Sequence, residues 1–176
     1  AKAWQAYETA TIPRFYLDLK KYKKATDEDS SPFTPPINLM YGLQAALQMM
    51  KAEGLEAIFA RHQRHTNATR AAMKALNLPL FAPDDAASNA ITAVIPGTVD
   101  AEKIRGTMRK KFDIAMAGGQ DHLKGKIFRI GHLGFVCDRD ILSCIGALEA
   151  TLIELGHSGV TAGAGVAAAA QVLAQG

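Results

Sequence analysis

The chain has 176 residues, of which 48% are hydrophobic and 21% are charged, and its formal net charge is +3. These are ordinary values for a globular protein, and the length allows one domain or a small domain with a connecting segment. The excess of positive charge is too small and too scattered to indicate a nucleic-acid partner. The longest apolar stretch, around residues 141–153, contains Glu149 and is too short to span a bilayer, so we expect no membrane partner either.

The first part of the chain has helical character. In residues 1–24 apolar and aromatic side chains recur at roughly helical spacing, and Pro13 interrupts them. A polar loop follows over residues 26–32. The run Thr34-Pro35-Pro36 then predicts the start of a long helix, with Thr34 as its N-cap and proline in its first turn, and Gly54 predicts its end.

The second part alternates helices with short strands. A second long helix is predicted over residues 55–76, and the last long helix, capped by Asp138, carries an apolar stripe made of Ile141, Cys144, Ile145, Leu148, Leu152 and Leu155. The other expected elements are strands at 90–95, 114–117 and 126–131, a helix at 100–111 capped by Asp100, and a further alanine-rich helix in the tail. This order predicts an α+β fold in which helices cover one face of a mainly antiparallel sheet.

The strand at 126–131 contains a charged residue, Arg129. Since side chains alternate between the two faces of a strand, Arg129 shares a face with Ile127 and Gly131, while Phe128 and Ile130 point the other way. Spacing alone favours an edge strand that exposes one charge to water. The alternative is an arginine held on a rigid strand beneath glycines, with room for a small anion.

The histidines do not form a complete active site. His62 and His65 lie three residues apart on a predicted helix, but no carboxylate or cysteine has matching spacing, so we interpret them as part of a basic, solvated helix face and expect no metal site. His122 and His132 flank the arginine strand, and we interpret them as a loop or core histidine.

Cys137 and Cys144 are the only cysteines, and they lack metal-ligand spacing. They would lie about two turns apart on one helix, which is too far for a disulfide. Reduced thiols and a cytoplasmic location are therefore expected.

Two motifs resemble one enzyme family. The run AGGQDHLKGKIFRIGHLG at residues 117–134 is similar to the C-terminal signature of class V aminotransferases, and more narrowly to the alanine–glyoxylate and serine–glyoxylate group. The run TPPINLMYGL at 34–43, followed by EGLE at 53–56 and Arg61-His62, is similar to the interdomain helix region of that family. The resemblance covers essentially the whole chain. Some cyanobacterial members are labelled as the small, or tritium-exchange, subunit of a soluble hydrogenase, and the alanine-rich tail resembles theirs.

The resemblance implies a fold-type I pyridoxal phosphate enzyme, a homodimer with its active site at the subunit interface. It implies that Arg129 binds the substrate α-carboxylate, for which a planar guanidinium is well suited. It also implies that the hydroxyl of Thr34 binds the cofactor phosphate of the neighbouring subunit. Ser31 stands where many relatives have an aromatic hydroxyl, so its role stays open, as do those of His122 and His132.

The resemblance further implies that these residues are the C-terminal part of a longer protein. The lysine that holds the cofactor, the aspartate beside the pyridine nitrogen and the aromatic residue that stacks on the ring fall outside them, so no catalytic residue is expected in this segment. The implied parts are an interdomain segment with a long helix at 1–54, a small C-terminal α+β domain at 55–160 and a helical tail at 161–176. The large-domain portion of the same protein is an expected partner.

Three functions are consistent with these observations. The first is transamination between alanine or serine and glyoxylate, with small amino and keto acids as ligands. The second is a non-catalytic accessory or interaction subunit, as the soluble-hydrogenase label implies. The third, a cysteine desulfurase-like relative, is weak because Cys137 follows the arginine strand closely and lies outside any recognisable mobile loop.

Overall fold

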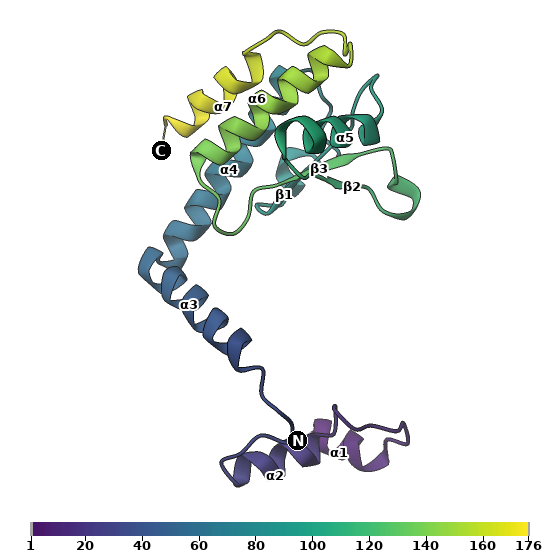
Figure 1. Ribbon diagram of the computed structural model, residues 1–176, viewed down its shortest axis with the longest axis vertical. Helices are drawn as coiled ribbons and strands as arrows, with labels where there is room; N and C mark the ends of the chain where they lie inside the picture. Colours follow the sequence, from purple (N-terminus) through teal and green to yellow (C-terminus); the bar gives the residue numbers. More distant parts are fainter. Residues whose placement is uncertain (1, 176) are drawn as a thin grey trace. The chain divides into compact units, whose positions relative to one another are not determined.

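The computed structural model describes residues 2–175 and divides into two compact units, one up to Ala52 and one from Glu53 onward (Figure 1). The described residues form seven α-helices, two short 3₁₀ turns and one three-stranded antiparallel sheet, which is the expected α+β class. None of the helices in this part of the chain combines the length and the apolar character needed to cross a membrane. Each unit is described by itself.

The first unit begins with two short helices, α1 (Lys2–Thr9) and α2 (Leu19–Asp27). Asp18 is the N-cap of α2, because its carboxylate accepts a hydrogen bond from the N–H of Lys20 at 3.0 Å. The same carboxylate accepts a hydrogen bond from the hydroxyl of Tyr7 at 2.6 Å, which ties α1 to α2. The irregular segment around Pro13 separates the helices, as the sequence predicts.

Helix α3 (Ile37–Glu53) begins later than predicted. Its first turn closes with a bond from the N–H of Met40 to the carbonyl of Pro36, so Thr34 lies outside the helix and the prediction that it is the N-cap is wrong. Proline disfavours the helical conformation in the residue before it, and the Pro35-Pro36 pair therefore delays the start. No residue of α3 is buried, and its exposed apolar side chains are those of Ile37, Leu39, Met40, Tyr41, Leu43, Leu47, Met49 and Met50.

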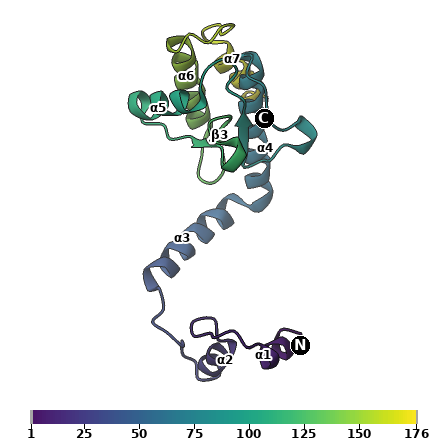
Figure 2. The same ribbon diagram turned by 90° about the vertical axis from the view of Figure 1, so that its right-hand side faces the viewer.

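The second unit contains α4 (Leu55–Ala75), α5 (Ala101–Phe112), α6 (Asp138–Glu154) and α7 (Ala164–Leu173). Helices α4, α6 and α7 lie side by side (Figures 1 and 2). Asp100 caps α5 as predicted, accepting a hydrogen bond from the N–H of Lys103. The predicted cap of α6 is wrong by one residue: Cys137 is the N-cap, and Asp140 accepts a hydrogen bond from its N–H at 2.9 Å.

The sheet has the strand order β1-β3-β2. Strands β1 (Ile91–Val94) and β3 (Phe128–Gly131) lie within the strands predicted from the sequence. The prediction of a strand at 114–117 is wrong for its first three residues, because β2 (Ala117–Gly118) shares only Ala117 with it. Both neighbours pair antiparallel with β3. The central position of β3 fixes the environment of every side chain on it.

The core lies between one face of the sheet and the helices. Phe128 and Ile130 of β3 and Val94 of β1 point into it, and all three are buried. The apolar stripe predicted for α6 is confirmed, since four of its members are buried and Cys144 and Leu155 are partly buried against them. The opposite face of the sheet, which carries Arg129, is not covered by these helices.

The start of α7 is held by a buried carboxylate from α6. Glu149 is 5% exposed and accepts hydrogen bonds from the main-chain N–H groups of Gly163, Gly165 and Val166, at 3.1, 2.5 and 3.2 Å. A negative charge at a helix N-terminus is stabilising because the first N–H groups of a helix have no partners within it. A Cβ at Gly165 would lie 2.9 Å from the side chain of Leu76, the C-cap residue of α4, so glycine favours this close approach.

Candidate substrate-carboxylate site

Arg129 stands in the middle of the sheet and not at its edge. It is paired with Ala93 of β1 on one side and with Ala117 of β2 on the other. Cross-strand partners point to the same face, so the guanidinium emerges between two methyl groups. The edge-strand interpretation is therefore wrong, because β1 and β2, which both precede β3 in the chain, pair with its two edges.

The guanidinium of Arg129 is anchored at its base and open at its tip. Its Nε donates a hydrogen bond to the carbonyl oxygen of Gly118 at 2.9 Å. Within residues 2–175 its two terminal nitrogens have no hydrogen bond or ion pair, and the residue is only partly buried. Paired planar donors above small side chains fit the two oxygens of a carboxylate.

His132 is a core residue that holds the end of the arginine strand. It is fully buried, with Nε2 2.9 Å from the hydroxyl of Thr92 and Nδ1 3.4 Å from that of Thr66. Burial lowers the pKa of His132 to about 4, so the ring is neutral at pH 7. The Thr66 hydroxyl already donates to the carbonyl of His62, so Nδ1 is the donor of the ring and Nε2 its acceptor.

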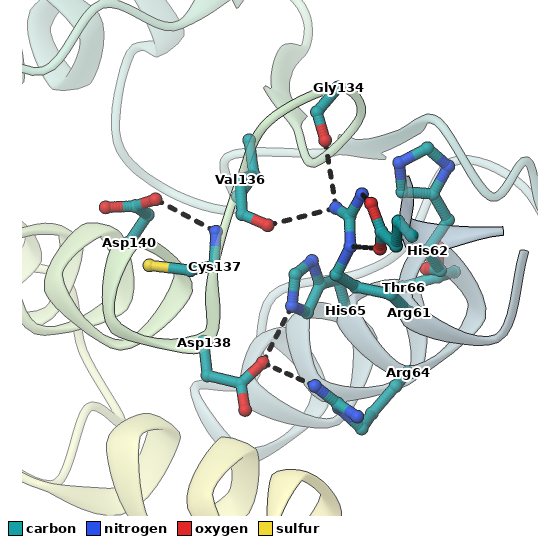
Figure 3. A network of polar contacts seen from close by, with 11 residues as sticks. Arg61, His62, Arg64, His65, Thr66, Gly134, Val136, Cys137, Asp138 and Asp140 are labelled. Atoms are coloured by element: carbon teal, nitrogen blue, oxygen red, sulfur yellow. Dashed lines mark hydrogen bonds and ion pairs between the residues drawn. The ribbon is translucent and has the colours of Figure 1, made fainter. Parts of the chain in front are cut away.

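The prediction that the histidines of α4 lie on a solvated face is wrong for His65, whereas His62 is half-buried. The side chain of His65 is fully buried, and its Nε2 lies 2.8 Å from a carboxylate oxygen of Asp138. Arg64 donates to the same oxygen at 2.8 Å and, as the largest cause, holds the pKa of Asp138 below its usual value (Figure 3). The start of α6 packs against this side of α4, so its polar side chains turn inward. Among the described residues no group of three or more His, Cys, Asp or Glu side chains could hold a metal ion.

Arg61 of α4 makes a contact that the sequence did not reveal. It forms a two-pronged pair with Glu53, and its Nη1 donates to the carbonyl oxygens of Gly134 and Val136 in the loop after β3 (Figure 3). The hydrogen bond from Arg61 lowers the pKa of the Glu53 carboxyl. These partners lie 73 and 75 residues away in the chain, and no local pattern predicts such a pairing.

Thr34 lies in the first unit and is exposed. Its hydroxyl has no hydrogen-bond partner within residues 2–175, so it is available to donate to a phosphate oxygen. The preceding Phe33 packs against Tyr16, with ring centroids 4.4 Å apart, and the hydroxyl of Ser31 donates to the carbonyl of Phe33. Ser31 therefore shapes the turn before Thr34.

The remaining residues singled out in the sequence are His122, Cys137 and Cys144. His122 is exposed in the short turn Asp121–Leu123, and it makes no hydrogen bond in the described part of the chain. Cys137 and Cys144 are both free thiols. Burial raises the pKa of Cys144 to about 11, which makes that thiol unreactive at neutral pH.

Comparison with known proteins gives a consistent result. The family described as "Aminotransferase class-V" matches residues 14–131. A soluble hydrogenase small subunit of Synechococcus sp. (strain PCC 6716) is 68% identical over 98% of this chain, and the match covers 45% of that protein. A serine–glyoxylate aminotransferase of Arabidopsis thaliana is 38% identical over 98% of this chain and 43% of its own length.

The fold matches solved structures in the same way. A crystal structure of ureidoglycine–glyoxylate aminotransferase from Bacillus subtilis superposes with a TM-score of 0.86 at 31% identity, covering 95% of this chain and 44% of that one. The chain therefore spans less than half the length of the relatives that it matches.

Proposed function

Since the chain belongs to the class-V aminotransferase family, we propose that it is the C-terminal portion of an enzyme that transfers the amino group of a small amino acid, alanine or serine, to glyoxylate. Membership of the family implies pyridoxal 5′-phosphate as the cofactor. Several relatives are named for glyoxylate as the amino acceptor, including the serine–glyoxylate and ureidoglycine–glyoxylate enzymes, and this supports the choice of acceptor.

The observation that carries the proposal is the open guanidinium of Arg129. Amino-acid donor and keto-acid acceptor share one group, the carboxylate next to the reacting carbon. A bidentate pair with Arg129 would hold both at the same place, and its strand would fix the direction of the reacting carbon relative to the cofactor. The alanines on either side leave room for that carboxylate.

Thr34 is the residue of this chain that we propose for the cofactor itself. Its exposed, unpartnered hydroxyl is chemically suited to the phosphate of pyridoxal phosphate. When bound, the cofactor supplies an electron sink for the bond to the α-carbon. We propose that the lysine holding it lies in the portion of the protein that precedes this segment.

We also propose that the full-length protein is a cytoplasmic homodimer. Two free thiols support a reducing compartment. Exposed apolar side chains along α3 support an interface, since contiguous apolar surface marks sites of association. A shallow apolar groove of α3, lined by Met40, Leu43, Gln44, Leu47, Gln48 and Lys51, is part of that surface.

A second function, that of a non-catalytic accessory subunit, is favoured by one observation. The relative from Synechococcus, at 68% identity, is named as a hydrogenase subunit. Chain length does not separate the alternatives, because the match covers 45% of that hydrogenase subunit and 43% of the Arabidopsis enzyme. Turnover of alanine or serine with glyoxylate by the full-length protein supports the enzyme, and a full-length protein that binds no pyridoxal phosphate and gives no turnover supports the accessory subunit.

Activity is the direct test. The full-length protein, loaded with pyridoxal phosphate, is expected to convert alanine or serine with glyoxylate, whereas residues 1–176 alone are expected to give no turnover and no absorbance of bound cofactor. Turnover by the isolated segment contradicts the assignment of the cofactor lysine to another part of the protein. Absence of any turnover by the full-length holoenzyme contradicts the proposed reaction.

A further inference from the structure

The side chain of Arg61 connects one helix to the loop that leaves the arginine strand. Its Nε and Nη2 bind the two oxygens of Glu53 at 2.6 and 3.0 Å. Its Nη1 donates to the carbonyl oxygens of Gly134 and Val136 at 2.9 and 3.1 Å (Figure 3). The guanidinium of Arg61 thus donates four hydrogen bonds. The two to Glu53 fix its orientation, and the two to carbonyl oxygens hold the loop.

The loop has little else to hold it. It runs from His132 to Cys137 between β3 and α6, beginning three residues after Arg129. Within residues 2–175, the two bonds from Arg61 are the hydrogen bonds that the main chain of residues 133–136 makes. The side chains of Leu133 and Phe135 are 53% and 90% exposed, and the apolar packing of the loop is limited to Val136, which lies partly buried against the core.

This loop borders the face from which Arg129 emerges. Gly131 lies two residues beyond Arg129 on β3, so both positions face the same side of the sheet. The side chain of Leu133 lies 3.8 Å from the point that a Cβ on Gly131 would occupy. The path of the loop therefore sets where Leu133 lies on the face of the sheet that carries Arg129.

We propose that Arg61 is a positioning residue for the carboxylate site of Arg129: paired with Glu53, it holds the loop 133–136 so that the site is formed before substrate binds. This inference rests on the proposed role of Arg129 in binding carboxylates. A site built on loops loses precision unless a supporting side chain fixes it, and displacements of about 1 Å are enough to weaken binding. Lysine replaces Arg61 only in part, because a single ammonium keeps the charge but lacks the planar fork that reaches a carboxylate and two carbonyls together.

The test measures carboxylate binding in the full-length holoenzyme, independently of turnover. The probes are propionate and its neutral counterpart propionamide, titrated by calorimetry. Arg61→Met, Arg61→Lys and Glu53→Gln are compared with Lys74→Met, which removes an ion pair with Asp84 from the same helix far from the loop. Hydrogen exchange at the amides of residues 133–137 reports the order of the loop.

We expect Arg61→Met to raise the Kd of propionate about tenfold, to leave that of propionamide within twofold and to accelerate exchange in the loop. KM for alanine and glyoxylate should rise more than kcat falls. Arg61→Lys and Glu53→Gln should show smaller effects in the same direction, and they carry the test if Arg61→Met does not fold. Lys74→Met should match the wild type in every measurement.

Other outcomes distinguish the positioning role of Arg61 from the proposed carboxylate-binding role of Arg129. If Arg129→Lys weakens propionate binding but the Arg61 variants bind it like the wild type, the positioning role is overturned and the proposed function stands. A fall in thermal stability of the Arg61 variants without a change in propionate affinity also overturns it, because Arg61 is then structural only. If Arg129→Lys itself binds propionate normally, the carboxylate role of Arg129 fails first, and the inference fails with it.

Discussion

The Nε of Arg129 lies 2.9 Å from the carbonyl oxygen of Gly118 on the neighbouring strand, so the arginine is fixed by the base of its guanidinium. That bond restricts rotation of the side chain and leaves both terminal nitrogens for a ligand. Anchoring and binding are thus done by different nitrogens of one residue. A lysine has a single nitrogen for both tasks.

Replacement of Arg129 by lysine in the full-length enzyme should therefore weaken the binding of amino-acid and keto-acid substrates alike. Charge is kept, but the paired planar donors are lost, and roughly 2–4 kcal/mol of transition-state binding should disappear. Steady-state kinetics with alanine and with glyoxylate measure this loss as a fall in kcat/KM for both.

Arg109→Lys is the matched control, because Arg109 is an exposed residue at the end of α5. It should leave both specificity constants unchanged. The free energy of unfolding of the Arg129→Lys holoenzyme should stay within about 1 kcal/mol of the wild type, which is the contribution of the one hydrogen bond from Nε that is lost. Unchanged kcat/KM in the Arg129→Lys enzyme contradicts the carboxylate role.

The methyl group of Ala117 offers a steric test of the same site. Ala117 pairs with Arg129 across the strands and is exposed, so Ala117→Leu adds three carbons beside the guanidinium without entering the core. We expect KM for both substrates to rise about tenfold or more, with little change in thermal stability. Ala117→Ser adds one small atom and should have the KM values of the wild type. If the leucine and serine variants raise KM equally, the cause is not steric.

The sequence predicted the strand of Arg129 and that Phe128 and Ile130 point to the opposite face, since these depend on local alternation. The structure shows that this opposite face is the core face. The sequence did not predict that Ala93 and Ala117 flank the arginine. Strand order and register arise from contacts between segments tens of residues apart, and β2 is too short to carry a pattern of its own.

Helix α4 shows the same limit. Its length and ends followed from periodicity and from Gly54, but the burial of His65 did not, because polar residues on a helix usually face water. His65 is buried since α6 begins beside it and offers Asp138 as a partner. Which face of a long helix receives another helix is a tertiary property, and one sequence contains no direct signal for it.

His132 should make stability depend on pH. Its folded-state pKa of about 4 lies below the ordinary value of 6.5, so between these values the unfolded chain binds a proton that the folded chain excludes. The contribution is complete above pH 6.5 and is lost as the pH falls toward 4, on the order of 3 kcal/mol in total. Urea unfolding of the full-length protein at a series of pH values measures it.

His132→Gln provides the comparison, because an amide can bond to the hydroxyls of Thr66 and Thr92 but does not titrate. The variant should be less stable at pH 7 and should lose less stability between pH 6.5 and 4 than the wild type. Carboxylates such as Asp138, whose pKa is lowered, also make stability depend on pH. Their contribution is the same in both proteins, so it cancels when the two stability curves are subtracted. If the free energy of unfolding changes with pH in the same way in both proteins, the burial of a neutral His132 is contradicted.

Glu149 should be a major source of stability for α7. In Glu149→Gln the carboxylate, which accepts hydrogen bonds from three N–H groups, is replaced by an amide whose NH₂ is itself a donor and faces those N–H groups. We expect the free energy of unfolding to fall by about 2–3 kcal/mol. Amide hydrogen exchange in residues 164–173 should become faster in this variant. Glu154→Gln, on the same helix but in an exposed pair with Lys111, should cost no more than about 0.5 kcal/mol. Similar losses for both variants contradict the capping role.

The apolar surface of α3 gives a prediction on assembly. Leu43 and Leu47 are 59% and 54% exposed, and in the proposed homodimer they are covered. The double variant Leu43→Glu, Leu47→Glu should place charges in that interface and shift the full-length protein toward monomer, measured by light scattering coupled to size-exclusion chromatography. A variant that stays dimeric, with normal cofactor absorbance, places the interface elsewhere.

The dependence of α7 on Glu149 has a consequence for synthesis on the ribosome. Helix α4 emerges early, and its fully buried Ala68 and Ala72 need the later helices as cover. α7 packs along α4, and its first N–H groups bind Glu149 of α6. The nascent second unit therefore exposes part of its apolar interior until residues up to 173 have been translated, and we expect this interval to be when chaperones bind it most strongly.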